Sequence, residues 1–523
     1  MLLYAESHYP RRWPSLTRRA EPEIVADVPW RVEPGAPVPL LLTARDAHWY
    51  PVRLESLGLI ARRADAPSGR PALMAEYPIG EAIAAPWWWR LVEVPPLPEP
   101  GDYLVAPVIR YTVGGRAREA VADNYRGTSH RPFLMRVAAQ RWPVPSGWWP
   151  GDAHVHTAFT RDQIEFGPPL AAIAQMSRAM GLAWAALTDH SYDLDDSRES
   201  YLANDPALPR WHDLLAELPQ DGACLIAGEE VSCGNARGRN VHLLAMGIRE
   251  HIPGAGDSAE RLLHTRPDLS IPEVIRRTRA QGGIAVAAHP GHTPPWRERV
   301  VFRRGAWEAA DLATGLDGVQ FWNGERDAGF HRGMAGWVQL LLSGKRTPAL
   351  AGSDSHGAFG RSRQVRVPWL SIADDRRHLF GRTRTVVRAD APMEHPLVDA
   401  LAAGRSYLTD GPALVIEAVA ETDRRGIGDR VLGPVCAVAI HARSTAEWGA
   451  IDRIGIAVGI VGEAAERWRW RAPGGGYECE WEAPLVLPPG RDAYVRAEAY
   501  TRSTADAPGA MAFTNPIWIS GGG

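Results

Sequence analysis

The sequence predicts an α/β protein in which a barrel of βα units lies between two β-rich, sandwich-like domains. Strand-like and helix-like segments alternate over residues 148–394, which is typical of βα units. Residues 1–147 and 395–523 instead contain short apolar runs separated by Gly and Pro, which is typical of β-sandwiches. In the central region, His and carboxylate residues follow successive strands, as expected where strand ends meet at one barrel face. A chain of 523 residues is long enough for three to four domains at about 150 residues each.

The N-terminal region is predicted to contain strands and no long helix. Residues 38–43 and 103–113 are strand-like, and Pro and Gly interrupt the chain between such runs. No apolar repeat with a helical period extends through this region. We therefore expect residues 1–147 to form a β-sandwich-like domain.

The central region begins with a strand that ends near residue 156, and two helices can be placed after it. One helix covers about 169–180 and ends at Gly181. A second begins after Ser270, because Glu273 three residues later completes a capping box and Gly282 follows the helix. The strand at 284–288 comes next. These alternations predict a helix-containing (β/α) domain over residues 148–394.

The C-terminal region opens with a short helix at about 396–403 and then becomes strand-rich. The runs at 414–419, 438–442, 454–461 and 493–500 are apolar or alternating and have strand lengths. We expect residues 395–523 to form a second β-sandwich-like domain.

Composition excludes several classes of function. The formal net charge is −3, so no large nucleic-acid or anionic-membrane partner is expected. No apolar run has the ~18–20 residues of a membrane span, and no secretory leader is visible. The four cysteines are too scattered for a disulfide framework, so a cytoplasmic location is expected. Lys345 is the only lysine, and its surroundings do not form a Walker A loop.

Metal-ligand residue types occur at the ends of successive predicted strands. His154 and His156 lie two apart, so both imidazoles project to one side of a strand and can chelate one ion. Asp354 and His356 repeat this spacing. Imidazole and carboxylate together suit zinc, manganese or iron. The further segments are Thr-Asp-His190, Gly-Glu-Glu230-Val, Val-His242 and Ala-His289-Pro. The combination predicts a metal centre.

The order of these motifs resembles that of the PHP (polymerase and histidinol phosphatase) metallohydrolase domain over roughly residues 150–360. The motifs are His-x-His, Thr-Asp-His, Gly-x-Glu-Val, Val-His, Ala-His-Pro and Ser-Asp-Ser-His. The segments 402–412 and 514–517 resemble the carbaryl-hydrolase-like (CehA/McbA-type) branch of that family. The resemblance implies a distorted seven-stranded (β/α) barrel followed by a β-sandwich. It also implies a centre of two or three divalent metal ions (Zn, Mn or Fe).

The resemblance assigns each ligand residue to a set. His154, His156 and Asp354 resemble ligands of a first metal; Glu230 resembles a carboxylate that bridges to a second metal, held also by His242 and His289; Asp162, His190 and His356 resemble a third set.

The sequence departs from the family pattern in two places. The early Asp usually lies five residues after the second His, where this chain has Arg161, and Asp162 follows. This inserted residue puts the third metal in doubt. Gln320 stands where the family often has Glu, and no metal ligand is expected there. The sequence also leaves open whether Glu229 or Glu230 is the ligand, although Val231 after Glu230 favours the latter.

The chemistry expected of such a centre is metal-assisted hydrolysis by a metal-bridging hydroxide. The positive charge of the metals favours an anionic small-molecule substrate, most simply a phosphate ester. His292 is a candidate acid for the leaving group, and Arg161 is a candidate clamp for an anionic oxygen.

Three alternatives remain open beside the phosphoesterase. The carbaryl-type tail is typical of a hydrolase of carbamates or aryl esters. An amidohydrolase also opens with His-x-His, but many of these bridge their metals with a lysine on a middle strand, and Lys345 precedes the last strand. A non-catalytic binding protein with a relic metal site would show no metal-dependent turnover.

Overall fold

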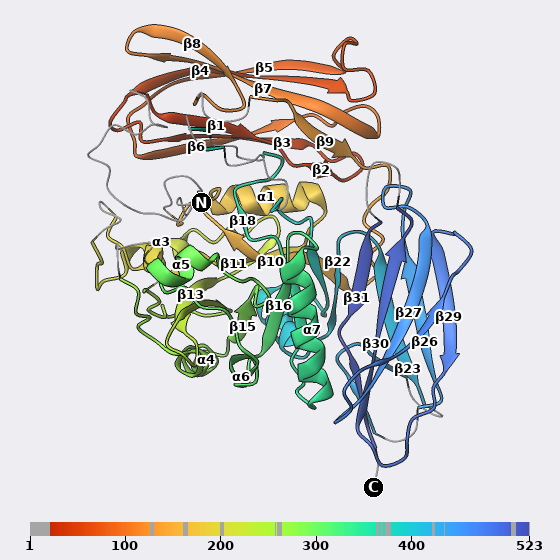
Figure 1. The fold of residues 1–523 in the computed structure, drawn as a ribbon. Coiled ribbons are helices and arrows are strands. Elements are labelled where there is room, and N and C mark those ends of the chain that lie inside the picture. The colour runs from red at the N-terminus through yellow and green to blue at the C-terminus, as the bar shows by residue number, and fades with distance from the viewer. Residues whose placement is uncertain are drawn as a thin grey trace.

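A computed structural model of the chain describes residues 21–125, 130–160, 166–198, 203–256, 258, 264–361, 366–367, 370–371, 378–420, 424–432, 435–503 and 509–521. The N-terminal strands lie over one end of the central region, and the C-terminal strands stand beside that region (Figure 1). None of the helices in these residues has the length and apolar character that a membrane span requires.

The N-terminal region is built from two β-sheets. One sheet has the order β1-β3-β6, and the other has the order β2-β9-β7-β4-β5 with β8 paired to β7. Apolar side chains from both sheets form one buried cluster, which includes Leu40, Leu57 and Ile109. The strands are β1 (Glu23–Asp27), β2 (Arg31–Val32), β3 (Val38–Arg45), β4 (Val52–Arg63), β5 (Leu73–Ile83), β6 (Trp87–Val94), β7 (Gly101–Val113), β8 (Arg116–Val121) and β9 (Phe133–Val137).

The central region contains both helices and strands. Its elements are β10 (Trp148–His156), α1 (Leu170–Met180), β11 (Trp184–Leu187), α2 (Ser191–Leu194), α3 (Pro209–Ala216), β12 (Cys224–Ile226), β13 (Gly228–Gly234), β14 (Asn240–Met246), α4 (Ile271–Ala280), β15 (Ile284–Ala288), α5 (Trp296–Val301), α6 (Ala309–Leu312), β16 (Gly318–Asn323), α7 (Ala328–Leu342), β17 (Ala349–Gly352), β18 (Ser355–His356), β19 (Arg366–Val367), β20 (Leu370–Ser371), β21 (Arg384–Arg388) and α8 (Glu394–Ala402).

The two helices that the sequence marks are present, with one difference at a cap. α1 ends at Gly181, which has a φ of 79° in the left-handed region that glycine adopts without strain. α4 begins after Ser270, as expected, but the Ser270 side chain makes no capping hydrogen bond. The sequence therefore predicted the position of α4 correctly, but the predicted capping box at Ser270 is not formed.

The expected fold class, a helix-containing (β/α)₇ barrel, is wrong. In the described residues, the central strands do not close into one hydrogen-bonded ring: apart from the short pair β19-β20, they belong to two separate sheets. One sheet has the strand order β13-β14-β15-β16-β17. In it, β14 runs antiparallel to both of its neighbours, β13 and β15. β10, β11 and β12 belong to a 12-stranded sheet that continues through β21 and β22 into the C-terminal strands.

Short connections between consecutive strands explain why the regular alternation of a (β/α) barrel is not formed. A parallel crossover needs a dozen or more residues, usually with a helix. Only Ala227 separates β12 from β13, and five residues separate β13 from β14, so no crossover helix can be placed there. Strands dominate the described chain, and βα units occur only locally, as in β10-α1-β11 and β16-α7-β17.

The C-terminal strands form a β-sandwich. One layer is the sheet β24-β23-β26-β29, and the other is the end β22-β31-β30-β27-β28 of the 12-stranded sheet. Apolar residues from both layers, such as Ile416, Ile456 and Val495, form one buried cluster. The strands are β22 (Ser406–Thr409), β23 (Ala413–Val419), β24 (Arg424–Gly426), β25 (Arg430–Leu432), β26 (Ala437–Arg443), β27 (Ile451–Ile460), β28 (Arg467–Arg471), β29 (Glu478–Pro484), β30 (Ala493–Thr501), β31 (Met511–Thr514) and β32 (Ile517–Ser520).

One buried arginine joins the three regions. Arg31 on β2 is fully buried; its guanidinium donates to Glu447 of the C-terminal region at 3.0 Å and to Glu33 at 2.6 Å. It also donates to the carbonyl of Met180 at the end of α1, and its central carbon lies 3.7 Å from the ring centroid of Trp142. A buried cation with these partners is costly to remove, because its removal leaves carboxylates without compensation.

We predict that Arg31→Met lowers the free energy of unfolding by about 3–5 kcal/mol, because the substitution removes the cation that hydrogen-bonds to Glu33 and Glu447, whose side chains are largely shielded from water. Arg53→Met serves as the control, since Arg53 pairs with Glu55 on the surface of the same region and such pairs contribute about 0–1 kcal/mol. Urea titration followed by circular dichroism measures both. Equal effects of the two substitutions would contradict the role assigned to Arg31.

Candidate metal centre

The strand β10 ends in two histidines whose Nε2 atoms lie 3.3 Å apart. Both His154 and His156 are fully buried. The Nδ1 atom of His154 lies 3.3 Å from Oε1 of Gln320, and Nδ1 of His156 lies 3.2 Å from Oγ1 of Thr160. Because these outer nitrogens are engaged, the two Nε2 atoms are the ones presented to the centre of the cluster.

Glu230 lies at the middle of the cluster and is almost fully buried. Its Oε1 lies 2.9 Å from Nδ1 of His242 and 3.2 Å from Nε2 of His289. Its Oε2 lies 3.2 Å from Nδ1 of His190, 3.4 Å from Nε2 of His156 and 3.6 Å from Nε2 of His154. One carboxylate thus faces five imidazoles.

Asp354, which lies between β17 and β18, contacts the two histidines of β10. Its Oδ1 lies 3.3 Å from Nε2 of His154 and 3.2 Å from Nε2 of His156. Its Oδ2 accepts a hydrogen bond from Nδ2 of Asn323 at 3.0 Å. Gly352 two residues earlier must be glycine, because a Cβ there would lie 2.7 Å from the Cβ and the backbone nitrogen of His154.

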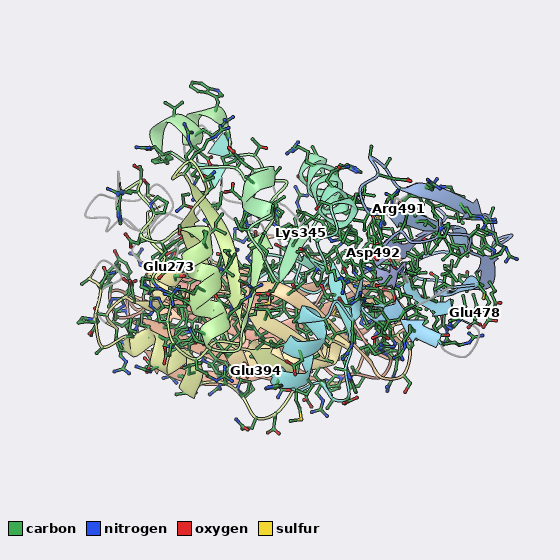
Figure 2. The ribbon with its side chains drawn as sticks, turned by 90° about the horizontal axis from the view of Figure 1, so that it is seen from below. Glu273, Lys345, Glu394, Glu478, Arg491 and Asp492 are labelled. Carbon is green, nitrogen blue, oxygen red and sulfur yellow. The ribbon has the colours of Figure 1, made fainter. Side chains whose placement is uncertain are left out.

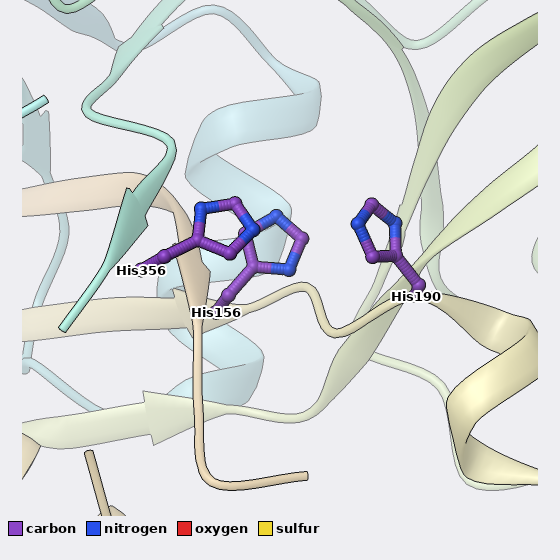
Figure 3. A group of neighbouring side chains, drawn as sticks. All are labelled: His156, His190 and His356. Atoms are coloured by element: carbon purple, nitrogen blue, oxygen red, sulfur yellow. The ribbon is translucent and has the colours of Figure 1, made fainter. Parts of the chain in front are cut away.

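Three imidazoles gather on the other side of the cluster (Figure 3). The rings of His156 and His356 are stacked with centroids 3.9 Å apart, and the His190 ring lies 4.6 Å from that of His156. Their ligand nitrogens lie within 4.8 Å of one another. Nδ1 of His356 donates to the carbonyl of Asp354, whereas its buried Nε2 has no hydrogen-bond partner among the residues that the structure describes.

The charges of the cluster shift the pKa values in opposite directions. Burial would raise the pKa of Glu230, but His242 and His154 hold it well below its usual value. Burial would lower the pKa of His156, but Asp354 and Glu230 raise it to about 10. Burial, together with the neighbouring His156, places the pKa of His356 well below its usual value. Without metal, the carboxylates are therefore ionised and His156 carries a proton at neutral pH.

Asp189 fixes the loop that follows β10. Its carboxylate accepts hydrogen bonds from the backbone nitrogens of Thr157 at 2.7 Å and Thr160 at 2.9 Å, and from both hydroxyls. Since the Thr160 hydroxyl donates to Asp189, it accepts from Nδ1 of His156. Asp189 thus orients His156 through Thr160.

Two of the donors sit on a strained backbone. His289 has a φ of 32° and Asp354 a φ of 54°, in a region that non-glycine residues seldom adopt. Such conformations cost about 1–3 kcal/mol and persist where surrounding structure enforces them, typically at functional sites. Their occurrence at two converging donors therefore points to function.

The structure brings together eight of the nine residues that the sequence assigned to metal binding. They are His154, His156, His190, Glu230, His242, His289, Asp354 and His356. The ninth, Asp162, and the clamp candidate Arg161 lie outside the described residues.

The register around Glu230 is also clear. The side chain of Glu229 points away from the cluster, where it accepts a hydrogen bond from the Ile252 nitrogen at 2.7 Å and lies 3.4 Å from His251. Burial raises the pKa of Glu229 to about 8. Lys345, on which the amidohydrolase alternative depends, is exposed after α7 and does not line the cavity (Figure 2).

The cluster opens into a cavity of about 460 Å³. His292 lines its wall and does not belong to the donor groups. Burial and the nearby His289 lower the pKa of His292. The sequence analysis missed other polar lining residues, among them Arg304, Asn323 and His378. Only Asn323, at the end of a predicted strand, had a signal that could have identified it.

The donor set fits divalent metal ions. Four groups of three donors each have ligand atoms within 4.8 Å of one another, and they share Glu230, His154, His156 and His190 among them. The buried Nε2 of His356 supplies an independent observation, because it lacks a hydrogen-bond partner within the described part of the chain, and a buried nitrogen without any partner is unfavourable. Imidazole and carboxylate donors suit zinc, manganese or iron.

No protein-family model and no curated protein matches the chain. Among solved structures, the chain matches a calcium-binding mutant of Bacteroides uniformis beta-glucuronidase 2. The identity is 13%, the match covers 95% of this chain and 60% of that chain, and the TM-score is 0.18. A glycosyl hydrolase family 2 member from Bacteroides cellulosilyticus matches with 9% identity, 97% and 64% coverage, and a TM-score of 0.15. The chain thus spans less than two thirds of the length of these proteins. At such TM-scores the matches carry no argument about its chemistry.

We predict that Glu230→Gln abolishes metal retention, because the substitution removes the charge shared by the donor groups. Glu229→Gln is the matched control: the raised pKa of Glu229 makes it uncharged near pH 7, so the amide changes little there. Metal content of the purified variants, measured by inductively coupled plasma mass spectrometry, checks this. Metal loss in Glu229→Gln alone would show that the register is wrong.

We also predict that metal binding releases protons at pH 7 and weakens as the pH falls. The raised pKa of His156 means that a proton occupies this histidine below about pH 10, and a metal must displace it. Each proton released raises the apparent dissociation constant about tenfold per unit fall in pH. Titration calorimetry in buffers of different ionisation enthalpy counts the protons. A count of zero at pH 7 would refute this linkage.

Proposed function

We propose that this protein is a metal-dependent hydrolase that cleaves phosphate esters. The observation that carries the proposal is the convergence of eight imidazole and carboxylate side chains, from strand ends far apart in the sequence, into one cluster beside a cavity that four of them line. The resemblance of the ordered motifs to PHP metallohydrolases supports it. Divalent metal ions would be held by these donors, and they would supply Lewis acidity toward a water nucleophile and the substrate oxygens.

The residues of the chain divide the remaining tasks. Glu230 and Asp354 provide negative charge that holds cations, while the imidazoles supply neutral donors. The burial of these side chains excludes bulk water from the base of the cavity, so electrostatic interactions are strong there. His378 lies in the wall and can give a proton to a leaving group, whereas the lowered pKa of His292 favours its neutral form at pH 7. The Nδ1 atom of His378 donates to the carbonyl of Ser353 at 2.7 Å, which leaves Nε2 for this purpose.

Arg304 favours an anionic substrate. It lines the same cavity as Glu230 and Asp354 and is 9% exposed. Burial lowers its pKa to about 9, so the guanidinium still carries its charge at neutral pH. Guanidinium groups bind phosphate oxygens through charge-assisted hydrogen bonds. A neutral carbamate or aryl ester would gain less from this side chain.

The test is a rate comparison on the protein loaded in turn with zinc, manganese and iron. Aryl phosphate mono-, di- and triesters are compared with an aryl carbamate and an aryl carboxylic ester. We expect phosphate esters to be hydrolysed fastest, with the activity lost on chelation and in Glu230→Gln. Faster hydrolysis of the carbamate or carboxylic ester would favour the carbaryl-hydrolase-like alternative. If no substrate is turned over in a metal-dependent way, the result would favour a binding protein.

Arg304→Met provides a sharper prediction. Loss of one charge-assisted contact should raise KM for anionic phosphate esters about 10- to 100-fold, while KM for a neutral triester should change little. Arg303→Met, at the exposed neighbouring arginine, is the control. An equal effect of Arg304→Met on charged and neutral substrates would refute its role in anion binding.

A further inference from the structure

We propose that the amide side chains of Gln320 and Asn323 form a positioning relay that orients three donors of one metal position. These donors are His154, His289 and Asp354, whose ligand atoms lie within 4.8 Å of one another. The inference rests on the proposed metal-dependent function and extends it to residues that do not touch the metal. Gln320 is fully buried on β16, and Asn323 ends the same strand.

Backbone partners fix the orientation of the Gln320 amide. Its Oε1 accepts a hydrogen bond at 3.1 Å from the backbone nitrogen of His289, and a backbone N–H can only donate. Its Nε2 donates to the backbone carbonyl of Trp322 at 3.3 Å, which can only accept. The oxygen and nitrogen of this amide are therefore not interchangeable.

The fixed orientation of Gln320 determines the polarity of its other contacts. Oε1 faces Nδ1 of His154 at 3.3 Å, so that nitrogen must carry the hydrogen. The Nε2 atom of this imidazole is then available to a metal. On the other side, Nε2 of Gln320 donates to Oδ1 of Asn323 at 2.9 Å. Asn323 in turn presents Nδ2 to Oδ2 of Asp354 at 3.0 Å.

The relay also supports the strained backbone of the site. The hydrogen bond from the His289 nitrogen holds the residue whose φ is 32°, and the Asn323 contact holds the side chain of the residue whose φ is 54°. Because Oδ2 of Asp354 is engaged by Asn323, Oδ1 is the oxygen directed toward the histidines. Three donors from three strand ends are thus connected through two amides.

A glutamate at position 320 could not perform this role. An ionised carboxylate would accept from His154 and from the His289 nitrogen, but it could not donate to the Trp322 carbonyl or to Asn323. Oxygen atoms would then face each other at 2.9–3.3 Å, the distances that the amide now spans as donor. The amide is therefore required for the Asp354 arm, although the carboxylate would suffice for the His154 arm.

The experiment measures zinc affinity by competition with a chromophoric chelator, expressed per folded protein from circular dichroism. We expect Gln320→Leu to weaken zinc binding about 10- to 100-fold, the range typical for residues that orient metal ligands. Asn323→Leu should also weaken binding, and Gln320→Glu should bind more tightly than Gln320→Leu but more weakly than the native chain.

Asn124→Leu is the matched control, because Asn124 is likewise a buried amide with two backbone contacts, to Ile24 and Pro22, but lies in the N-terminal region. It should lower the melting temperature without changing zinc affinity. Unchanged affinity in Gln320→Leu, or equal losses in Gln320→Leu and Asn124→Leu, would overturn the relay. Native affinity in Gln320→Glu would overturn its donor half.

The outcomes separate the relay from the proposed function. If the native protein binds zinc, and Gln320→Leu weakens this binding, but no phosphate ester is hydrolysed, the relay stands and the phosphoesterase proposal falls. If phosphate esters are hydrolysed but Gln320→Leu binds zinc normally, the relay falls alone. A native protein that binds no zinc, manganese or iron would overturn both.

Discussion

The burial of Glu230 among five histidines is the constraint on which the arrangement of the centre depends. Removing a carboxylate from water costs several kcal/mol, and the cost must be offset by nearby positive charge or hydrogen bonds. The strands β10 and β14 and the loops after β11 and β15 bring these partners to Glu230 on β13. Conversely, the imidazoles are neutral donors, so the negative charge that offsets repulsion between neighbouring cations must come from the carboxylates.

Other buried carboxylates hold the loops around the centre by accepting backbone hydrogen bonds. Asp152 accepts from the nitrogens of Ser353 and Gly381, each at 2.8 Å, and so ties the segment before Asp354 to β10. Asp27 accepts from the nitrogen of Phe359 at 2.9 Å and joins β1 to the segment after β18. These contacts make the loops rigid, so the donors are positioned before any ligand binds.

The flanking β regions take part in this support. Asn515, which lies between β31 and β32, accepts from the Ala349 nitrogen at 2.7 Å and donates to the Ala349 carbonyl at 3.0 Å, at the first residue of β17. Its Nδ2 also donates to the hydroxyl of Ser406 on β22. The tail motifs that resemble the carbaryl-hydrolase-like branch thus anchor the strand that leads to Asp354.

The sequence by itself determined the donor residue types, their order at strand ends, the β-rich flanking regions and the ends of α1, because these depend on local spacing and turn chemistry. It did not determine the sheet arrangement: local alternation of strands and helices predicted a closed (β/α) barrel, whereas a short connection joins β13 and β14 as an antiparallel pair, and β15 also pairs antiparallel to β14. Nor did it decide between Glu229 and Glu230, which lie on opposite faces of β13. The contacts of Gln320 and the burial of Arg304 likewise depend on segments that are distant in the chain. Only the tertiary structure therefore decided these two features.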